Sequence, residues 1–221
     1  MKYSLAIFDM DGTVLNTISD IAGAVNYILN KYEYTTYTED EVLQFVGQGL
    51  KFTLSHALSS QNATIKENKF DTMYADFITY YAKHSNDKTT PYTGIIDVLK
   101  KLKNQGVQLA LVSNKRHEQV QELCNIYFPN LFEIAYGESK ELGISKKPNP
   151  DSIHAILKKL AIPAKKTVYI GDSEIDIQTA KNANIDCIAV GWGFRSKKFQ
   201  KEHGAKIFAT IPEDILTIIE S

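Results

Sequence analysis

Two aspartates separated by one residue, Asp9 and Asp11, follow the apolar run at residues 5–8 near the start of the chain. Such a run predicts a buried strand, and open α/β sheets bind ligands at the carboxyl ends of their strands. Alternate strand residues share a face, and Gly12 permits a tight turn beyond them. Two carboxylates this close need a cation or a shared proton. The pair therefore predicts a metal site with a possible carboxylate nucleophile, the alternative being an ordinary Asp- and Gly-rich turn.

Polar groups also follow a second predicted strand, at residues 107–112. The Ser113 hydroxyl can donate to a phosphate oxygen, and Asn114 can donate or cap a following helix, whose free N–H groups favour an anion. An ordinary helix cap is the alternative for this segment.

A lysine stands in a rigid context at Lys147-Pro148-Asn149-Pro150. The prolines stiffen the chain before a helix that runs toward Leu160, with Asn149 as its predicted N-cap. Lys147 can neutralise phosphate charge as a point cation, although a lysine in a lysine-rich chain is more often solvated surface.

A fourth segment places two more carboxylates after a strand. The strand predicted at residues 167–170 ends at Gly171-Asp172, and Asp176 follows four residues later. If a helix begins near Ser173, Asp176 faces the same site one turn on. Asp172 and Asp176 would then complete a set of oxygen ligands for Mg²⁺, and helix capping is the alternative.

In this order the four segments resemble the haloacid dehalogenase superfamily of phosphotransferases, and the resemblance spans essentially the whole chain. Within it, the chain looks most like the phosphoglycolate phosphatase group. That finer similarity is carried by residues 91–95, the apolar helix after them and residues 191–195.

The resemblance implies a role for each motif residue. Asp9 would be the nucleophile that forms an aspartyl phosphate, and Asp11 would protonate the leaving alcohol and then activate water. The Asp11 carbonyl, Asp9 and Asp172 would hold Mg²⁺, with Asp176 supporting the metal directly or through water. The phosphoryl oxygens would be bound by Thr13, Ser113, Asn114 and Lys147. Asp11 argues against the dehalogenase branch, because a halide leaving group needs no proton.

The composition, with 43% hydrophobic and 23% charged residues among 221, is ordinary for a soluble globular protein. A net charge of −1 gives no footprint for nucleic acid or anionic membrane. No apolar run approaches the roughly 20 residues that span a bilayer, and Asp9 and Asp11 interrupt any signal peptide. Cys124 and Cys187 are isolated, which favours free thiols in a reducing compartment. We expect a cytoplasmic protein, monomeric or weakly dimeric, whose partner is a small phosphorylated metabolite.

The order of periodic segments predicts two domains. Residues 16–84 have helical spacing: residues 18–29 and 70–81 each trace an apolar face, and a capping box at Thr38 and Glu41 opens a helix predicted to run through Val46. From Gly94 onward helices alternate with strands, as in a parallel sheet. The fold class is therefore α/β: a Rossmann-like parallel sheet with helices on both faces, plus an inserted helical cap. The core takes residues 1–15 and 90–221, and the cap takes residues 16–89. A cap on two linkers can act as a lid, and the turn at residues 47–51 is the candidate surface facing Asp9, with a simple helix break as the alternative.

Substrate identity is less well defined by the sequence. Only two of the 25 basic residues are arginines, Arg116 and Arg195, and each follows a predicted active-site loop. With Lys51 of the cap, they are candidates to grip a substrate carboxylate or second phosphate, and surface positions are the alternative. The best candidate function is Mg²⁺-dependent hydrolysis of 2-phosphoglycolate. A pyrophosphatase and a sugar phosphomutase of the same superfamily stay open, and a non-catalytic binding protein would be expected to lack Asp9 or Asp11.

Overall fold

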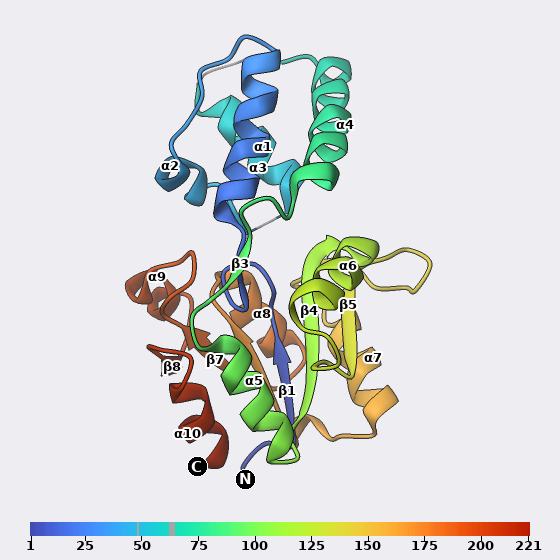
Figure 1. Ribbon diagram of the computed structural model, residues 1–221, viewed down its shortest axis with the longest axis vertical. Helices are drawn as coiled ribbons and strands as arrows, with labels where there is room; N and C mark the ends of the chain where they lie inside the picture. The colour runs from blue at the N-terminus through green and yellow to red at the C-terminus, as the bar shows by residue number, and fades with distance from the viewer. Residues whose placement is uncertain (48, 62–64) are drawn as a thin grey trace. The chain divides into compact units, whose positions relative to one another are not determined.

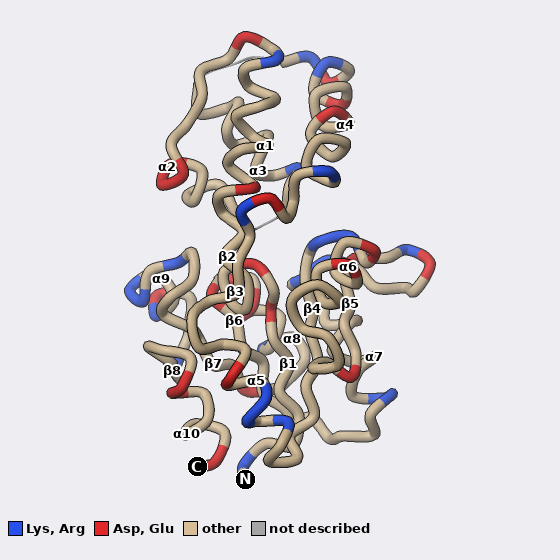
Figure 2. Tube along the Cα trace, in the orientation of Figure 1, with Lys and Arg blue, Asp and Glu red and all other residues tan. Residues whose placement is uncertain are grey.

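A computed structural model describes residues 1–47, 49–61 and 65–221. The chain divides into two compact units. The sheet unit comprises Met1–Leu15 and Pro91–Ser221, and the helical unit comprises Asn16–Thr90. The second boundary lies one residue later than the sequence predicts. Acidic and basic residues are both spread over each unit (Figure 2).

The sheet unit is built on a six-stranded sheet of order β5-β4-β1-β6-β7-β8, in which the pairings are parallel (Figure 1). The strands are β1 (Leu5–Phe8), β4 (Gln108–Arg116), β5 (Ile134–Glu138), β6 (Thr167–Gly171), β7 (Asp186–Val190) and β8 (Ile207–Ala209). β1 lies between β4 and β6, so the first motif occupies the centre of the sheet. The predicted Rossmann-like α/β class is confirmed. β8, a short strand at the sheet edge, was not predicted.

Helices cover both faces of this sheet, because successive residues of a buried strand point to opposite sides. In β1, Ala6 and Phe8 pack in one apolar cluster, and Leu5 and Ile7 pack in another. The first cluster includes side chains of α5 (Ile95–Asn104), α6 (His117–Tyr127) and α10 (Asp214–Glu220). The second includes side chains of α7 (Asp151–Leu160) and α8 (Glu174–Asn182). A 3-10 turn at Ala164–Lys166 and α9 (Lys197–Glu202) complete this unit.

The helical unit contains α1 (Ile18–Lys31), α2 (Glu39–Leu43), α3 (Leu50–Ser59) and α4 (Glu67–His84). The predicted apolar face of α1 is buried, as are Met73, Phe77 and Tyr81 of α4. The capping box of α2 is present: the Thr38 hydroxyl accepts from Glu41 N, and the Glu41 carboxylate accepts from Thr38 N. Where the chain passes between the units, β2 (Leu15–Asn16) pairs with β3 (Thr90–Pro91).

Two details of the helical unit differ from the sequence prediction. A helix through Val46 was predicted, but α2 ends at Leu43, and Phe45 N donates to Val42 O in a tighter turn. The turn predicted at residues 47–51 includes Gln48, which lies outside the described residues. None of the described helices is long and apolar enough to cross a membrane.

Candidate active site

The loop after β1 is folded tightly on one carbonyl. Met10 O accepts hydrogen bonds from the backbone N–H groups of Thr13, Val14 and Leu15. Gly12 has a φ of 78°, and a Cβ there would lie 2.5 Å from an Asp172 oxygen. Only glycine fits both the backbone conformation and this close approach. The turn therefore brings the end of β1 against the end of β6.

Three buried carboxylates meet at these strand ends. Asp9, Asp172 and Asp176 each offer an oxygen within 4.8 Å of the others, and their exposed fractions are 6%, 1% and 0%. Carboxylate oxygens are the ligands that Mg²⁺ prefers. This donor set could hold a divalent cation, and the residues present fit the metal that the sequence predicts.

Lys147 supplies positive charge to the same cluster. Its Nζ lies 2.7 Å from Asp9 Oδ1 and 2.7 Å from Asp176 Oδ1, and it donates to the Tyr169 hydroxyl at 3.2 Å. Burial would by itself lower the pKa of Lys147, but the carboxylates of Asp176 and Asp9 raise it well above its usual value. Lys147 is therefore a fixed ammonium at the end of β1 and not the surface residue of the alternative interpretation.

The carboxylates nevertheless outnumber this cation. Burial, followed by the charge of Asp176, raises the pKa of Asp9 well above its usual range. The same two causes raise the pKa of Asp172 to about 7. Buried carboxylates resist losing their protons unless positive charge is added. This cluster is thus electrostatically suited to bind a cation.

Asp172 is held by donors from three segments. Phe194 N donates to Oδ2 at 2.6 Å, the Thr13 hydroxyl donates to Oδ1 at 3.3 Å, and Gln200 Nε2 donates to the backbone carbonyl at 2.7 Å. Trp192 Nε1 donates to Thr13 O at 3.0 Å. The loop at residues 191–195 therefore borders the site. Gln200, which is fully buried, was missed in the sequence, since an isolated glutamine carries no motif.

Asp176 has both of the roles that the sequence offers for it, helix capping and membership of the carboxylate cluster. Ser173 precedes α8 as its N-cap, and Asp176 Oδ2 accepts from the Ser173 hydroxyl at 2.6 Å and from Ser173 N at 3.0 Å. Its other oxygen pairs with Lys147. Asp176 thus caps the helix and also belongs to the carboxylate cluster.

The second motif lies beside the first, with one correction. Ser113 is buried on β4, the neighbour of β1. Asn114 was expected to cap a helix, but β4 continues to Arg116, which is the N-cap of α6. The Asn114 amide is used elsewhere: Oδ1 accepts from Lys147 N at 2.7 Å, and Nδ2 donates to Lys147 O at 3.4 Å. Asn114 therefore fixes the backbone that carries Lys147.

The segment around Lys147 also differs slightly from expectation. The Lys147–Pro148 peptide is cis, and α7 begins at Asp151 with Pro150 as its N-cap. Asn149 was the predicted cap, and its side chain does accept from Asp151 N at 3.0 Å. The helix therefore begins one residue later than the sequence predicts, and Asn149 accepts this hydrogen bond from the position before the N-cap.

Lys115 is a second buried cation, and the sequence analysis missed it. Its Nζ lies 3.1 Å from Asp11 Oδ1, and its side chain is 3% exposed, against 23% for Asp11. A lysine in a lysine-rich chain gives no signal by type. Lys115 therefore becomes recognisable as a site residue only through its contact with Asp11 in the folded chain.

The three predicted substrate-recognition cations are placed as follows. Arg195 Nε donates to Glu174 Oε2 at 3.3 Å, and its guanidinium lies 5.6 Å from the Phe199 ring. Arg116 is exposed at the end of β4. Lys51 belongs to the helical unit and is also exposed. Its Nζ lies 3.9 Å from Asp71 and near the rings of Phe70 and Tyr74.

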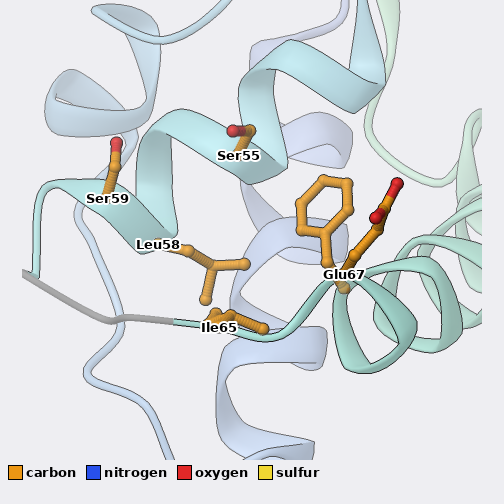
Figure 3. Close-up of a pocket in the computed structure, with 6 residues that line it drawn as sticks. Ser55, Leu58, Ser59, Ile65 and Glu67 are labelled. Carbon is orange, nitrogen blue, oxygen red and sulfur yellow. The ribbon is translucent and has the colours of Figure 1, made fainter.

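A separate pocket of about 290 Å³ lies within the helical unit (Figure 3). Its described lining consists of Ser55, Leu58, Ser59, Ile65, Glu67 and Phe70. No basic side chain is among these lining residues, so the pocket does not share the anion-binding chemistry of the site on the sheet.

Comparisons with known proteins agree with this geometry. The family model described as haloacid dehalogenase-like hydrolase matches residues 6–190. The phosphoglycolate phosphatase of Colwellia psychrerythraea is 31% identical over 218 residues, covering 96% of this chain and 95% of that protein. The Psychrobacter arcticus phosphoglycolate phosphatase is 32% identical over 200 residues, covering 88% and 86%. A crystal structure from Lactobacillus delbrueckii, of a protein assigned as a phosphoglycolate phosphatase, is 39% identical, with a TM-score of 0.94 and 99% of each chain covered.

Proposed function

The chain belongs to the haloacid dehalogenase-like hydrolases, as a phosphatase, and we propose that it hydrolyses a small phosphomonoester with Mg²⁺ through an aspartyl phosphate on Asp9. The best candidate substrate is 2-phosphoglycolate, which the names of its relatives suggest. One observation carries the proposal most directly: Asp9 lies at the end of the central strand, within 2.7 Å of the buried ammonium of Lys147 and beside Asp172 and Asp176.

The metal would be held by Asp9, Asp172 and the backbone carbonyl of Asp11, with Asp176 acting directly or through water. When bound, Mg²⁺ would offset the repulsion between a carboxylate nucleophile and an anionic phosphate. The raised pKa values of Asp9 and Asp172 support this assignment. They show that the buried carboxylates lack enough nearby positive charge, and a divalent cation would provide it.

Asp9 would attack phosphorus, and the ester oxygen would leave with a proton from Asp11. Asp11, then a carboxylate, would take a proton from the water that hydrolyses the aspartyl phosphate. Asp11 suits these roles because it stays partly exposed beside the buried Asp9. The phosphoryl oxygens would be bound by Thr13, Ser113, Lys147 and the second amide hydrogen of Asn114, whose other amide groups bond to the Lys147 backbone.

The helical unit, predicted at residues 16–89, is proposed to act as a cap over the site of the core, predicted at residues 1–15 and 90–221. A lid of this kind would exclude bulk water during the reaction. Arg195, Arg116 and Lys51 stay predicted contacts to the substrate. The protein is proposed to be cytoplasmic and monomeric or weakly dimeric.

Two other reactions could use the same carboxylates. A pyrophosphatase would release phosphate from pyrophosphate, and a sugar phosphomutase would require a bisphosphate to return the phosphoryl group to its substrate. A panel containing 2-phosphoglycolate, other small esters, sugar phosphates and pyrophosphate, assayed for phosphate release with Mg²⁺ or with a chelator, distinguishes them. We expect 2-phosphoglycolate to be hydrolysed most efficiently and chelation to stop the reaction. A preference for pyrophosphate, or full activity in chelator, would contradict the proposal.

A further inference from the structure

Lys115 is a buried cation to which the chemistry above gives no role. It is 5% exposed, and its Nζ lies 3.1 Å from Asp11 Oδ1. Burying an ammonium is unfavourable unless anions surround it. Lys147 already lies between Asp9 and Asp176, at the phosphoryl end of the site. Lys115 therefore places a separate positive charge beside Asp11, where the proposed mechanism has the ester oxygen leave.

The backbone around Lys115 is shaped to hold it there. Between Val112 and Arg116 the register of β4 against β5 shifts: Val112 pairs with Tyr136, and Arg116 pairs with Glu138. Such a shift marks a β-bulge or a related irregularity, and features of this kind change the direction of side chains and are common near active sites. This segment is also tied internally, because Lys115 N donates to the Ser113 hydroxyl at 3.2 Å.

Gly137 of β5 lies against the backbone of this irregular segment of β4. A Cβ at this position would lie 2.5 Å from Lys115 O and 2.8 Å from the Arg116 carbonyl carbon. Only a residue without a side chain allows the two strands to approach this closely. The place of Lys115 is thus fixed by its own strand and by its neighbour.

We propose that Lys115 binds a carboxylate of the substrate, so that the preferred substrates are phosphate esters of 2-hydroxycarboxylic acids. The inference rests on the proposed function, because it takes Asp11 as the proton donor to the ester oxygen. That donor must lie about 2.6–3.2 Å from the oxygen. In such an ester a single carbon separates the ester oxygen from the carboxylate, which brings the carboxylate within ion-pair reach of Lys115 Nζ.

The predicted arginines fit this role less well. Arg195 pairs with Glu174, to which the proposed function gives no part in the reaction, and Arg116 is exposed where β4 ends, whereas Lys115 pairs with Asp11, the proposed proton donor. A buried cation gains more from a substrate anion than an exposed one, since water screens it less. Lys115 is therefore better placed than either arginine to bind a second negative charge of the substrate.

The test compares two substrates of similar size, 2-phosphoglycolate and ethyl phosphate, in which a methyl group replaces the carboxylate. The parent, Lys115→Met and Lys115→Arg are assayed for kcat/KM on both. For Lys115→Met we expect the ratio of phosphoglycolate to ethyl phosphate to fall about 10- to 150-fold, as for loss of a charge-assisted contact, mainly through KM. Lys115→Arg keeps the charge and should retain more of the ratio. Lys158→Met, which removes an exposed lysine on α7, is the matched control and should leave the ratio unchanged.

Each outcome decides a separate question. Equal relative losses on both esters would show that Lys115 acts only through Asp11, and would overturn the inference while leaving the proposed function standing. A parent enzyme that releases phosphate from neither ester, nor from any other in the panel, would overturn the proposed function itself. If Lys115→Met does not fold, Lys115→Gln makes the same comparison. Glutamine is neutral but can still donate to Asp11, and an unchanged ratio in this variant would also overturn the inference.

Discussion

The ammonium of Lys147 bridges two carboxylates from different parts of the chain, lying 2.7 Å from Asp9 and 2.7 Å from Asp176. Asp9 follows the central strand and Asp176 lies in α8, so the three residues join the first, third and fourth motifs at one point. An ammonium between two carboxylates stabilises a site that is otherwise rich in negative charge. Its removal is the first test of that account.

Lys147→Met should destabilise the protein strongly in chelator. Breaking a buried ion pair typically costs about 3–5 kcal/mol, because the remaining charges are left uncompensated. Added Mg²⁺ should recover part of this loss by supplying positive charge. Urea unfolding with chelator and with Mg²⁺ measures both effects. Lys146→Met is the control, since Lys146 pairs with Glu138 at a partly exposed site and should contribute about 1 kcal/mol or less. Equal stability of Lys147→Met and the parent in chelator would refute the account.

Asp11→Asn should lower kcat most for esters whose leaving group must be protonated to depart. General acid catalysis contributes about 10²- to 10⁴-fold, so hydrolysis of ethyl phosphate should fall by about this factor. p-Nitrophenyl phosphate should lose less, because nitrophenolate leaves as an anion. The kcat values on both esters, with circular dichroism to verify folding, make the comparison. Parent-like turnover of ethyl phosphate by folded Asp11→Asn would show that Asp11 is not the acid.

The effect of Mg²⁺ on stability should grow with pH. The pKa of Asp172 is raised to about 7, so between about pH 4 and pH 7 the folded, metal-free protein holds a proton that the unfolded chain releases. Its free energy of unfolding should therefore decrease as the pH rises through this range. Mg²⁺ competes with that proton, so the Mg²⁺-induced rise in Tm should be small at pH 5 and larger at pH 8. Melting curves with chelator or Mg²⁺ across this range test the prediction, and a pH-independent rise would disagree with it.

Arg195→Ala should change substrate preference less than Lys115→Met does. Arg195 is paired with Glu174 through side chains that are only 12% and 16% exposed, so its charge is already offset by a carboxylate of the protein. We expect the ratio of kcat/KM on phosphoglycolate to that on ethyl phosphate to fall by less than the roughly tenfold lower limit expected for Lys115→Met. A larger fall than in Lys115→Met would instead make Arg195 the main contact to the carboxylate.

Local signals were read correctly because their causes are local. The buried face of α1 follows from helical spacing, and the capping box of Thr38 and Glu41 follows from a spacing of three residues. The strand ends were also placed well enough to bring Asp9, Asp172 and Asp176 together, since parallel strands share one carboxyl edge.

The errors arise from partners that are distant in sequence. Asn114 has the sequence signature of a helix cap, but its amide bonds to the backbone of Lys147, 33 residues away. Lys115 looks like any other lysine until the irregularity of β4 and the glycine opposite it are known. Such contacts depend on the register between strands, which no single segment specifies.

Asp9→Asn tests the central claim most directly. The substitution keeps the shape of the side chain and removes the nucleophilic carboxylate, so phosphate release from 2-phosphoglycolate with Mg²⁺ should fall to background. Circular dichroism and the melting curve should show a folded protein. Phosphate release at the parent rate by folded Asp9→Asn would contradict the assignment of Asp9 as nucleophile, and with it the proposed mechanism.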